Sequence, residues 1–260
     1  MSATLPVPTS AFRCALLVPT YNNPLTVRGV VETARKHLEH VIVVDDGSSP
    51  ACRQACEEIA ADGLAHVHHR ERNGGKGAAV KTGFEVARDL GFTHALQVDA
   101  DGQHDLQAIP EFLAVGRSDP AAVLLGCPRY DDSAPRHRVV ARKLTRFWVD
   151  LEVGKGRIED TMIGFRLYPL DVVKHVNIAG NRMDFDVEIA VRLAWIGARI
   201  VNMPVAVRYL DESEGGVSHF QVFWDNVRFT WMHSKLMTIK CSVWCMEKLR
   251  IYRRRRLPPA

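Results

Sequence analysis

Short apolar segments alternate with helical patterns through the first half of the chain. The segments are rich in valine and leucine, and the best formed are apolar on both faces, which is typical of buried parallel strands. They occupy residues 14–19, 40–46, 65–69, 94–101 and 122–128. The stretches between them are long enough for helices, which we expect at residues 24–38, 50–62, 75–90 and 106–117. This alternation predicts right-handed strand–helix–strand units and an α/β fold with a doubly wound sheet.

The pattern changes after residue 130. Residues 135–153 form an arginine-rich helical stretch, and residues 184–197 predict a further helix. Residues 164–169 and 198–209 predict two more strands. We interpret this half as a continuation of the same domain.

A long helical pattern covers residues 219–252. Its apolar side chains recur every three or four positions and form one continuous stripe. The stripe consists of Phe229, Met232, Leu236, Ile239, Val243, Met246 and Leu249. Three tryptophans lie nearby, with lysine and arginine beside the stripe. A basic amphipathic helix of this kind can lie in a membrane interface, and a helix packed on the body or on a partner subunit is the alternative.

Composition and charge narrow the class of protein. With 47% hydrophobic and 25% charged residues, the chain resembles an average soluble domain, which excludes disorder as its main state. The net charge of +4 divides into +7 for residues 235–260 and −3 for residues 1–234. A basic end on a slightly acidic body predicts an anionic surface partner, membrane lipid or nucleic acid, with a solvated disordered tail as the alternative.

The cysteines and the apolar runs indicate the compartment. None of the six cysteines belongs to a C-x-x-C pair, which argues against a zinc site. The first twelve residues lack the basic and apolar regions of a signal peptide, and no run of 18 apolar residues occurs. We therefore expect a cytoplasmic protein with reduced thiols.

Polar residues gather where three of the predicted strands end. The first strand runs into residues 19–23 (PTYNN), the second into 45–49 (DDGSS) and the fourth into 99–104 (DADGQH). In open α/β sheets, ligands bind outside the carboxyl ends of the strands. Three such clusters in succession predict one shared binding cleft.

The DADGQH segment is the most informative of the three. Asp99, Asp101 and Gln103 alternate and offer oxygen ligands suited to Mg²⁺ or Mn²⁺. An ion held there can stabilise the charge on a diphosphate leaving group. An EF-hand loop is excluded, because its sixth and twelfth positions would be His104 and Pro110. Carboxylates that only cap a turn or a helix remain the alternative.

Two further segments offer nucleotide contacts. Asp45 can accept a hydrogen bond from a base, while for Asp46 a turn or capping role is as plausible as a ligand role. The glycine-rich stretch at residues 73–83 opens a helix, and Lys76 adds positive charge suited to phosphate. This stretch matches neither a P-loop nor the G-x-G-x-x-G dinucleotide motif. Arginines suited to phosphate follow it at positions 129, 138, 142 and 166.

Together these segments resemble glycosyltransferase family 2, with its GT-A nucleotide-sugar fold, and within it the dolichol-phosphate mannose synthase branch of polyprenyl-phosphate glycosyltransferases. The resemblance covers residues 14–210, and its strength lies in six motifs that follow the family's order and spacing. They are V-P-T-Y-N (18–22), V-D-D-G-S (44–48), N-G-G-K-G-A-A (73–79), D-A-D-G-Q-H (99–104), D-x-x-x-G-F-R-L-Y (160–168) and F-D-V-E (185–188).

The resemblance implies an inverting, metal-dependent transfer of a sugar from a UDP- or GDP-linked donor to a lipid acceptor, most simply a polyprenyl phosphate. The positions that match donor contacts are Pro19, Tyr21, Asn23, Asp45, Lys76 and Asp99. Asp99 and Asp101 match the metal-binding D-x-D motif, with Gln103 as a further ligand of Mg²⁺ or Mn²⁺. Arg129, Arg142 and Arg166 match acceptor-side positions. Asp99, Asp101, Asp186 and Glu188 are the catalytic candidates.

The acceptor decides whether a general base is needed. A phosphate acceptor is already ionised, whereas a hydroxyl must lose a proton to a carboxylate, for which Asp184 or Asp186 is the candidate. We expect the phosphate route, with transfer to a hydroxyl of a glycan or another lipid in cell-envelope biosynthesis as the alternative.

Two features depart from the branch. Asn22 and Asn23 follow Tyr21 where mannose synthases typically carry Asn-Glu, and the paired C-terminal spanning helices of related bacterial enzymes are missing. We expect a GT-A domain over residues 12–215 and a basic amphipathic extension over 216–260, with residues 219–256 as a peripheral anchor on the inner face of the membrane.

Proteins of other classes fit the sequence less well. A sugar-phosphate nucleotidyltransferase would begin with G-x-G-T-R, which is absent. A non-catalytic membrane-binding protein is supported by the basic tail alone. We expect no nucleic-acid partner, because the basic residues lack the interleaved aromatic platform of a recognisable module.

Overall fold

The strands form one mixed sheet. The computed structural model describes residues 11–130, 136–208 and 222–248. Its strands are β1 (Cys14–Thr20), β2 (Val41–Asp45), β3 (His66–His69), β4 (His94–Gln97), β5 (Val123–Tyr130), β6 (Arg166–Pro169) and β7 (Ile200–Val207), in the spatial order β3-β2-β1-β4-β6-β5-β7. All seven lie where the sequence predicts strands. β6 runs antiparallel to β4 and β5, which period-2 patterning does not encode, because strand direction depends on how the chain returns to the sheet.

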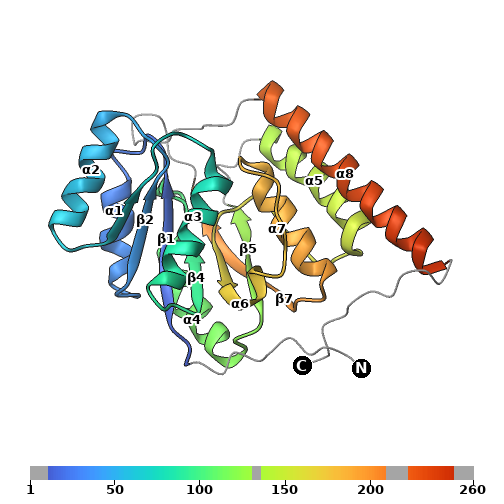
Figure 1. Ribbon diagram of the computed structural model, residues 1–260, viewed down its shortest axis with the longest axis horizontal. Coiled ribbons are helices and arrows are strands. Elements are labelled where there is room, and N and C mark those ends of the chain that lie inside the picture. The colour runs from blue at the N-terminus through green and yellow to red at the C-terminus, as the bar shows by residue number, and fades with distance from the viewer. Residues whose placement is uncertain (1–10, 131–135, 209–221, 249–260) are drawn as a thin grey trace.

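Helices cover both faces of the sheet (Figure 1). They are α1 (Val27–Arg35), α2 (Pro50–Ala61), α3 (Lys76–Asp89), α4 (Ile109–Ser118), α5 (Arg136–Val153), α6 (Leu170–Val173), α7 (Asp184–Trp195) and α8 (Val222–Lys248), with a 3₁₀ turn, η1, at Leu106–Ala108 before α4. Helices α1, α2 and α4 pack on one face, and α3, α6 and α7 on the other. The sequence did not predict α6, which is a single turn.

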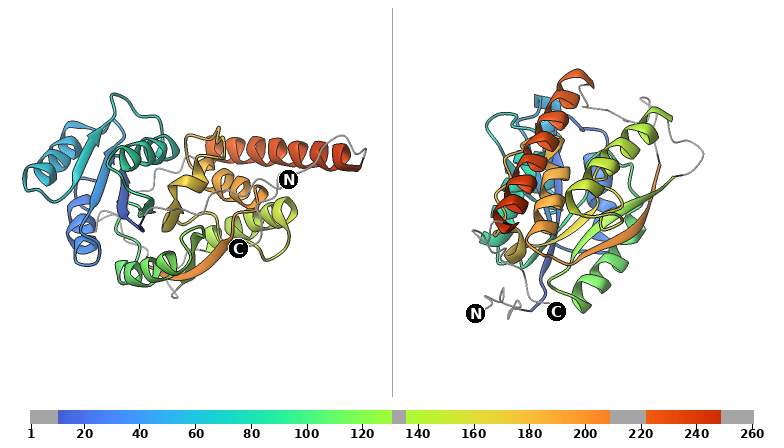
Figure 2. Two further views of the ribbon diagram at one scale, coloured as in Figure 1. Left: turned by 60° about the horizontal axis from the view of Figure 1, so that its bottom comes forward. Right: turned by 90° about the vertical axis from the view of Figure 1, so that its right-hand side faces the viewer.

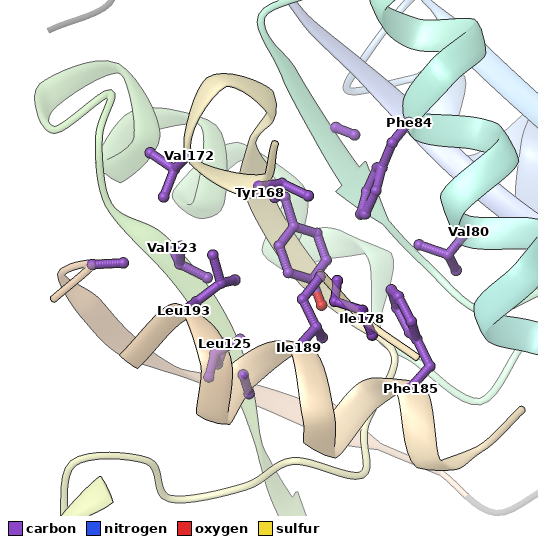
Figure 3. Packing of buried hydrophobic residues seen from close by; sticks show 14 of the residues in the cluster. Val80, Phe84, Val123, Leu125, Tyr168, Val172, Ile178, Phe185, Ile189 and Leu193 are labelled. Carbon is purple, nitrogen blue, oxygen red and sulfur yellow. The ribbon is translucent and has the colours of Figure 1, made fainter. Parts of the chain in front are cut away.

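Two hydrophobic clusters form the core, one on each face. Successive side chains of a strand point to opposite faces, so Leu16 and Val18 of β1 enter one cluster and Leu17 enters the other. In the second cluster the Tyr168 and Phe84 rings meet edge to face at 5.2 Å, and apolar side chains of α7 point toward the strands (Figure 3). The doubly wound α/β fold expected from the sequence is confirmed.

Helix α8 packs against α7 and α5. Of the predicted apolar stripe, Met232 and Leu236 are buried, and Phe229 packs against the same core cluster. Ile239, Val243 and Met246 are half-buried. His233 joins α8 to α5 through the Glu152 carboxylate, 2.8 Å away. In the described part of the chain, no helix combines the length and the apolar character needed to cross a bilayer. The predicted domain boundary at residue 215, Leu249 and the arginines at 253–256 lie outside the described residues.

Candidate active site

The carboxyl ends of β1, β2 and β4 meet at one edge of the sheet. These three strands are parallel neighbours, and the polar segments predicted from the sequence leave the sheet at this edge. Asn22 binds the second segment on both sides: its N–H donates to the Ser48 hydroxyl at 3.0 Å and its amide oxygen accepts from the Ser49 N–H at 2.8 Å. The Thr26 hydroxyl donates to the Ala100 carbonyl at 2.6 Å. The three polar segments therefore lie in contact with one another, as the sequence predicts.

The carboxylates of Asp45 and Asp46 bind different parts of the site. The Asp46 carboxylate accepts from the N–H groups of Gly74 and Gly75, at 3.1 Å and 2.7 Å, and pairs with Arg70. It therefore anchors the glycine-rich loop. Asp45, also buried, accepts from the Ser48 N–H and lies 2.9 Å from His69. The sequence pattern left Asp46 between a turn role and a ligand role and did not indicate His69 or Arg70, because these pairings depend on β3 lying beside β2.

Lys76 begins α3 and lies between two carboxylates. Its ammonium group is 2.8 Å from Asp99 and 2.8 Å from Asp186. Burial alone disfavours the ammonium, but the two carboxylates outweigh it and raise the pKa of Lys76. For Asp99 the same contact reverses the effect of burial, and its pKa falls well below the usual range. Both Lys76 and Asp99 are therefore ionised at neutral pH.

The D-x-D segment turns tightly after β4. Gly102 has a φ of +73°, and the Gln103 N–H donates to the Asp101 carboxylate at 3.0 Å. Burial and the charge of Asp99 raise the pKa of Asp101, with His104 acting in the opposite direction. His104 was not predicted as a site residue. Its Nε2 lies 3.7 Å from Asp99, and neither of its buried ring nitrogens has a hydrogen-bond partner in the described part of the chain.

Gly164 leaves room for Asp99. A Cβ atom at this position would lie 2.1 Å from the Asp99 carboxylate, so only glycine fits there without displacing Asp99. The preceding loop is held by Asp160, which accepts from the N–H groups of Met162 and Ile163 and pairs with Arg142 at 2.5 Å. Arg142 of α5 therefore contacts the loop that borders the D-x-D segment.

Comparison with known proteins decides the family. Residues 15–186 match Glycosyl transferase family 2. The chain belongs to this family. It is 30% identical to the polyprenol monophosphomannose synthase of Mycolicibacterium smegmatis, over 79% of this chain and 80% of that protein. It is 29% identical to the undecaprenyl-phosphate mannosyltransferase of Micrococcus luteus, over 79% of this chain and 89% of that protein.

Solved structures share the fold of this transferase. The glucosyl-3-phosphoglycerate synthase of Mycobacterium tuberculosis in complex with UDP superposes with a TM-score of 0.62 and 15% identity. The match covers 87% of this chain and 79% of that one. The GT-A fold expected from the sequence is thus confirmed.

Arg166, predicted as an acceptor-side residue, is buried among backbone and side-chain partners. The side chain is 1% exposed. Its guanidinium donates to the Ile163 carbonyl at 2.9 Å and to the backbone carbonyl of Asp186 at 2.6 Å, and it lies 3.5 Å from the Asp186 carboxylate. Tyr168 is a further partner, at 3.3 Å. These contacts hold Asp186 in place, and the acceptor contact of Arg166 stays a prediction.

Glu188, predicted as a catalytic candidate, is bound by a loop and by a neighbouring arginine. Its carboxylate accepts from the Gly180 N–H and from Arg192, both at 2.7 Å. The cavity beside it is lined by the 179–184 loop and α8 and has a volume of about 320 Å³. These contacts tie the loop to α7 and do not involve Lys76, and the catalytic role of Glu188 stays a prediction.

The remaining predicted residues lie around the same edge. Pro19 is buried inside β1, and the backbone carbonyl of buried Asn23 accepts from the Val27 N–H at the start of α1. Tyr21, which lies between these two residues along the chain, is half-buried. Arg129 is exposed near the end of β5. As contacts to donor and acceptor, these residues stay predictions.

Proposed function

We propose that this transferase moves a sugar from a nucleoside-diphosphate donor to a polyprenyl phosphate, with inversion at the anomeric carbon. The two relatives that act on lipid-linked phosphates support the acceptor class. The donor would bind along the edge formed by β1, β2 and β4, in contact with Tyr21, Asn23 and Asp45. UDP- and GDP-linked sugars are the donors to compare.

The residues of the D-x-D segment fit a divalent ion. Asp99 and Asp101 supply carboxylate oxygens, and the unpartnered buried nitrogens of His104 adjoin them. In the described residues no three acidic, histidine or cysteine side chains form a complete metal cluster, so donor oxygens would have to complete the coordination. Asp99, Asp101 and Gln103 would hold Mg²⁺ or Mn²⁺, which would stabilise the leaving diphosphate. The glucosyl-3-phosphoglycerate synthase of Mycobacterium tuberculosis, which shares the fold, was solved in complex with Mn²⁺ and UDP-glucose.

The ion pairs of the Asp186 carboxylate favour a phosphate acceptor over a hydroxyl acceptor. Its carboxylate is 4% exposed and is bound by Lys76 and faced by Arg166. A carboxylate that already balances two cations is a poor proton acceptor. A phosphate acceptor needs none, because its oxygen is ionised. That oxygen attacks the anomeric carbon as the bond to the diphosphate breaks on the opposite side, and Lys76 lies where it can balance the diphosphate charge.

The acceptor phosphate would bind on the side of Arg142 and Arg129. Arg142 reaches the 160–164 loop, which borders Asp99. A polyprenyl phosphate is a membrane lipid, so we also infer peripheral attachment to the inner face of the membrane. Residues 219–256 are the segment predicted to provide this attachment. The proposed reaction involves no nucleic acid.

Calorimetry with UDP and GDP, each with and without Mn²⁺, tests the donor site. We expect Mn²⁺-dependent binding of one nucleotide to the wild type and its loss in Asp101→Ala. Asp105→Ala is the matched control, because Asp105 is exposed, directly follows the segment, and accepts with its side chain from the nearby Gln107 N–H. Binding that is unaffected by Asp101→Ala would remove the metal assignment.

Asp186→Asn tests the acceptor class. With a phosphate acceptor, we expect sugar transfer to a short-chain polyprenyl phosphate to fall by no more than about tenfold, with an unchanged pH profile, because no proton has to be removed. Loss of a true general base would cost roughly 10²–10⁴-fold. A loss of that size in folded protein, with the alkaline rate restored by a stronger base in solution, would favour a hydroxyl acceptor instead.

A further inference from the structure

The ammonium group of Lys76 takes the place of a cation beside Asp99. Its Nζ lies 2.8 Å from each of the two Asp99 carboxylate oxygens, so it sits between them. A divalent ion that binds a carboxylate through both oxygens needs the same side of that carboxylate. Both side chains keep some exposure, 13% for Lys76 and 21% for Asp99, so a ligand can reach the pair.

Asp99 has little room to turn away from Lys76. On another side its carboxylate is pressed against Gly164, where an added Cβ would lie 2.1 Å and 2.2 Å from the two oxygens. Lys76 differs, because its ammonium group is carried on a flexible four-carbon stem. When the two groups separate, it is therefore the ammonium group that moves.

The charges in contact around Asp99 are already balanced. Lys76 of α3 also lies 2.8 Å from Asp186 of α7, and these two helices are neighbours on one face of the sheet (Figure 2, left). Arg166 faces the same Asp186 carboxylate at 3.5 Å. Two cations and two carboxylates thus form a neutral cluster, and Asp101 can offset one more positive charge at most. A divalent ion added here is repelled by Lys76 with little screening from solvent.

The start of α3 makes a diphosphate depend on Lys76. Helix N-termini usually bind phosphate through their backbone N–H groups. In this loop the N–H groups of Gly74 and Gly75 donate to a buried carboxylate. The Ala78 N–H donates to the Asn181 carbonyl at 3.0 Å. Much of the usual capacity for phosphate is therefore used within the protein, and a diphosphate there relies more on the ammonium group.

We propose that Lys76 and the divalent ion compete for Asp99, and that the donor diphosphate ends this competition by taking over the ammonium group. The inference rests on the proposed function, which supplies both the metal and the donor. It assigns to Lys76 the coupling between them: the metal binds weakly alone, and metal and donor strengthen each other reciprocally.

Titration of the full chain with Mn²⁺, followed by the electron paramagnetic resonance signal of the free ion, tests the proposal. Lys76→Met should bind Mn²⁺ alone at least about tenfold more tightly than the wild type, because two carboxylates lose the cation that they share. Lys76→Arg keeps the charge and should bind Mn²⁺ as weakly as the wild type does. Lys81→Met is the matched control on the same helix, since Lys81 donates to the Ile178 carbonyl.

The coupling is measured with UDP and GDP. Mn²⁺ should strengthen binding of the preferred nucleotide to the wild type by at least about tenfold more than it does in Lys76→Met. Lys76→Gln provides a second neutral variant in case the methionine variant does not fold, because its amide can still donate to one carboxylate. Mn²⁺ alone should raise the Tm of either folded neutral variant more than that of the wild type.

The outcomes separate this inference from the proposed function. If neither folded neutral variant binds Mn²⁺ more tightly than the wild type, the proposal is wrong, although Mn²⁺-dependent nucleotide binding would still support the proposed function. Equal coupling in wild type and neutral variant would also overturn it. Tighter Mn²⁺ binding and weaker coupling in the neutral variants support it. If the wild type then transfers sugar to no polyprenyl phosphate, the proposed function fails while the competition for Asp99 stands.

Discussion

The ammonium group of Lys76 lies 2.8 Å from the carboxylate of Asp186, although the two residues come from different helices. The same ammonium is 2.8 Å from Asp99 of the D-x-D segment. One lysine therefore joins the D-x-D segment to α7. The contact also gives the almost fully buried Asp186 carboxylate a cationic partner.

Replacing Lys76 should damage both stability and donor binding. Lys76→Met leaves the buried Asp186 facing only Arg166, so we expect the free energy of unfolding to fall by roughly 3 kcal/mol. Denaturant titration measures this loss, and calorimetry with the nucleotide measures binding. Lys81→Met is the control on the same helix, because Lys81 donates to the Ile178 carbonyl and not to the site. Equal losses in both variants would contradict the special position of Lys76.

Gly164→Ala should disturb the D-x-D segment specifically. The new Cβ would lie 2.1 Å from the Asp99 carboxylate, which must then move away from Lys76. We expect loss of Mn²⁺-dependent nucleotide binding in protein that still melts cooperatively. Gly29→Ala is the control, since no atom lies within 4 Å of its added Cβ. It should keep binding, and its helix α1 should gain up to about 1 kcal/mol in stability.

His94 should make stability depend on pH. Burial lowers its pKa below the ordinary value of 6.5, although the Pro120 carbonyl, 2.9 Å from Nε2, acts in the opposite direction. Below about pH 6.5 the unfolded chain takes up a proton that the folded protein resists, so stability is lost as the pH falls. We expect Tm to fall less steeply in His94→Gln than in the wild type on acidification. Parallel Tm curves would show that His94 does not contribute.

His233→Ala should loosen α8. It removes the partner of the Glu152 carboxylate, which is 2% exposed. Burial raises the pKa of Glu152 and His233 opposes this, so the carboxyl of the variant should take up a proton at higher pH. We expect a loss of about 3 kcal/mol at neutral pH that shrinks in acid. Hydrogen exchange along α8 checks this, with the exposed Thr238→Ala as control; unchanged exchange in His233→Ala would contradict it.

The strands, the main helices and the polar segments at the strand ends could be predicted from the sequence. Hydrophobic periodicity reports which face of an element is buried, and the D-x-D spacing places Asp99 and Asp101 in one short segment after a strand. The family motifs likewise lie in consecutive segments. These are local properties, and the order of residues along the chain is enough to specify them.

Only the tertiary structure decided which residues meet across the fold. Arg166 and Glu188 match acceptor-side and catalytic motif positions, yet the structure buries Arg166 under Asp186 and ties Glu188 to Gly180. The apolar stripe of α8 was compatible with lipid or protein, and packing on the body covers its Met232 and Leu236 with protein. Periodicity cannot distinguish these outcomes, because it records that a side chain avoids water and not which surface covers it.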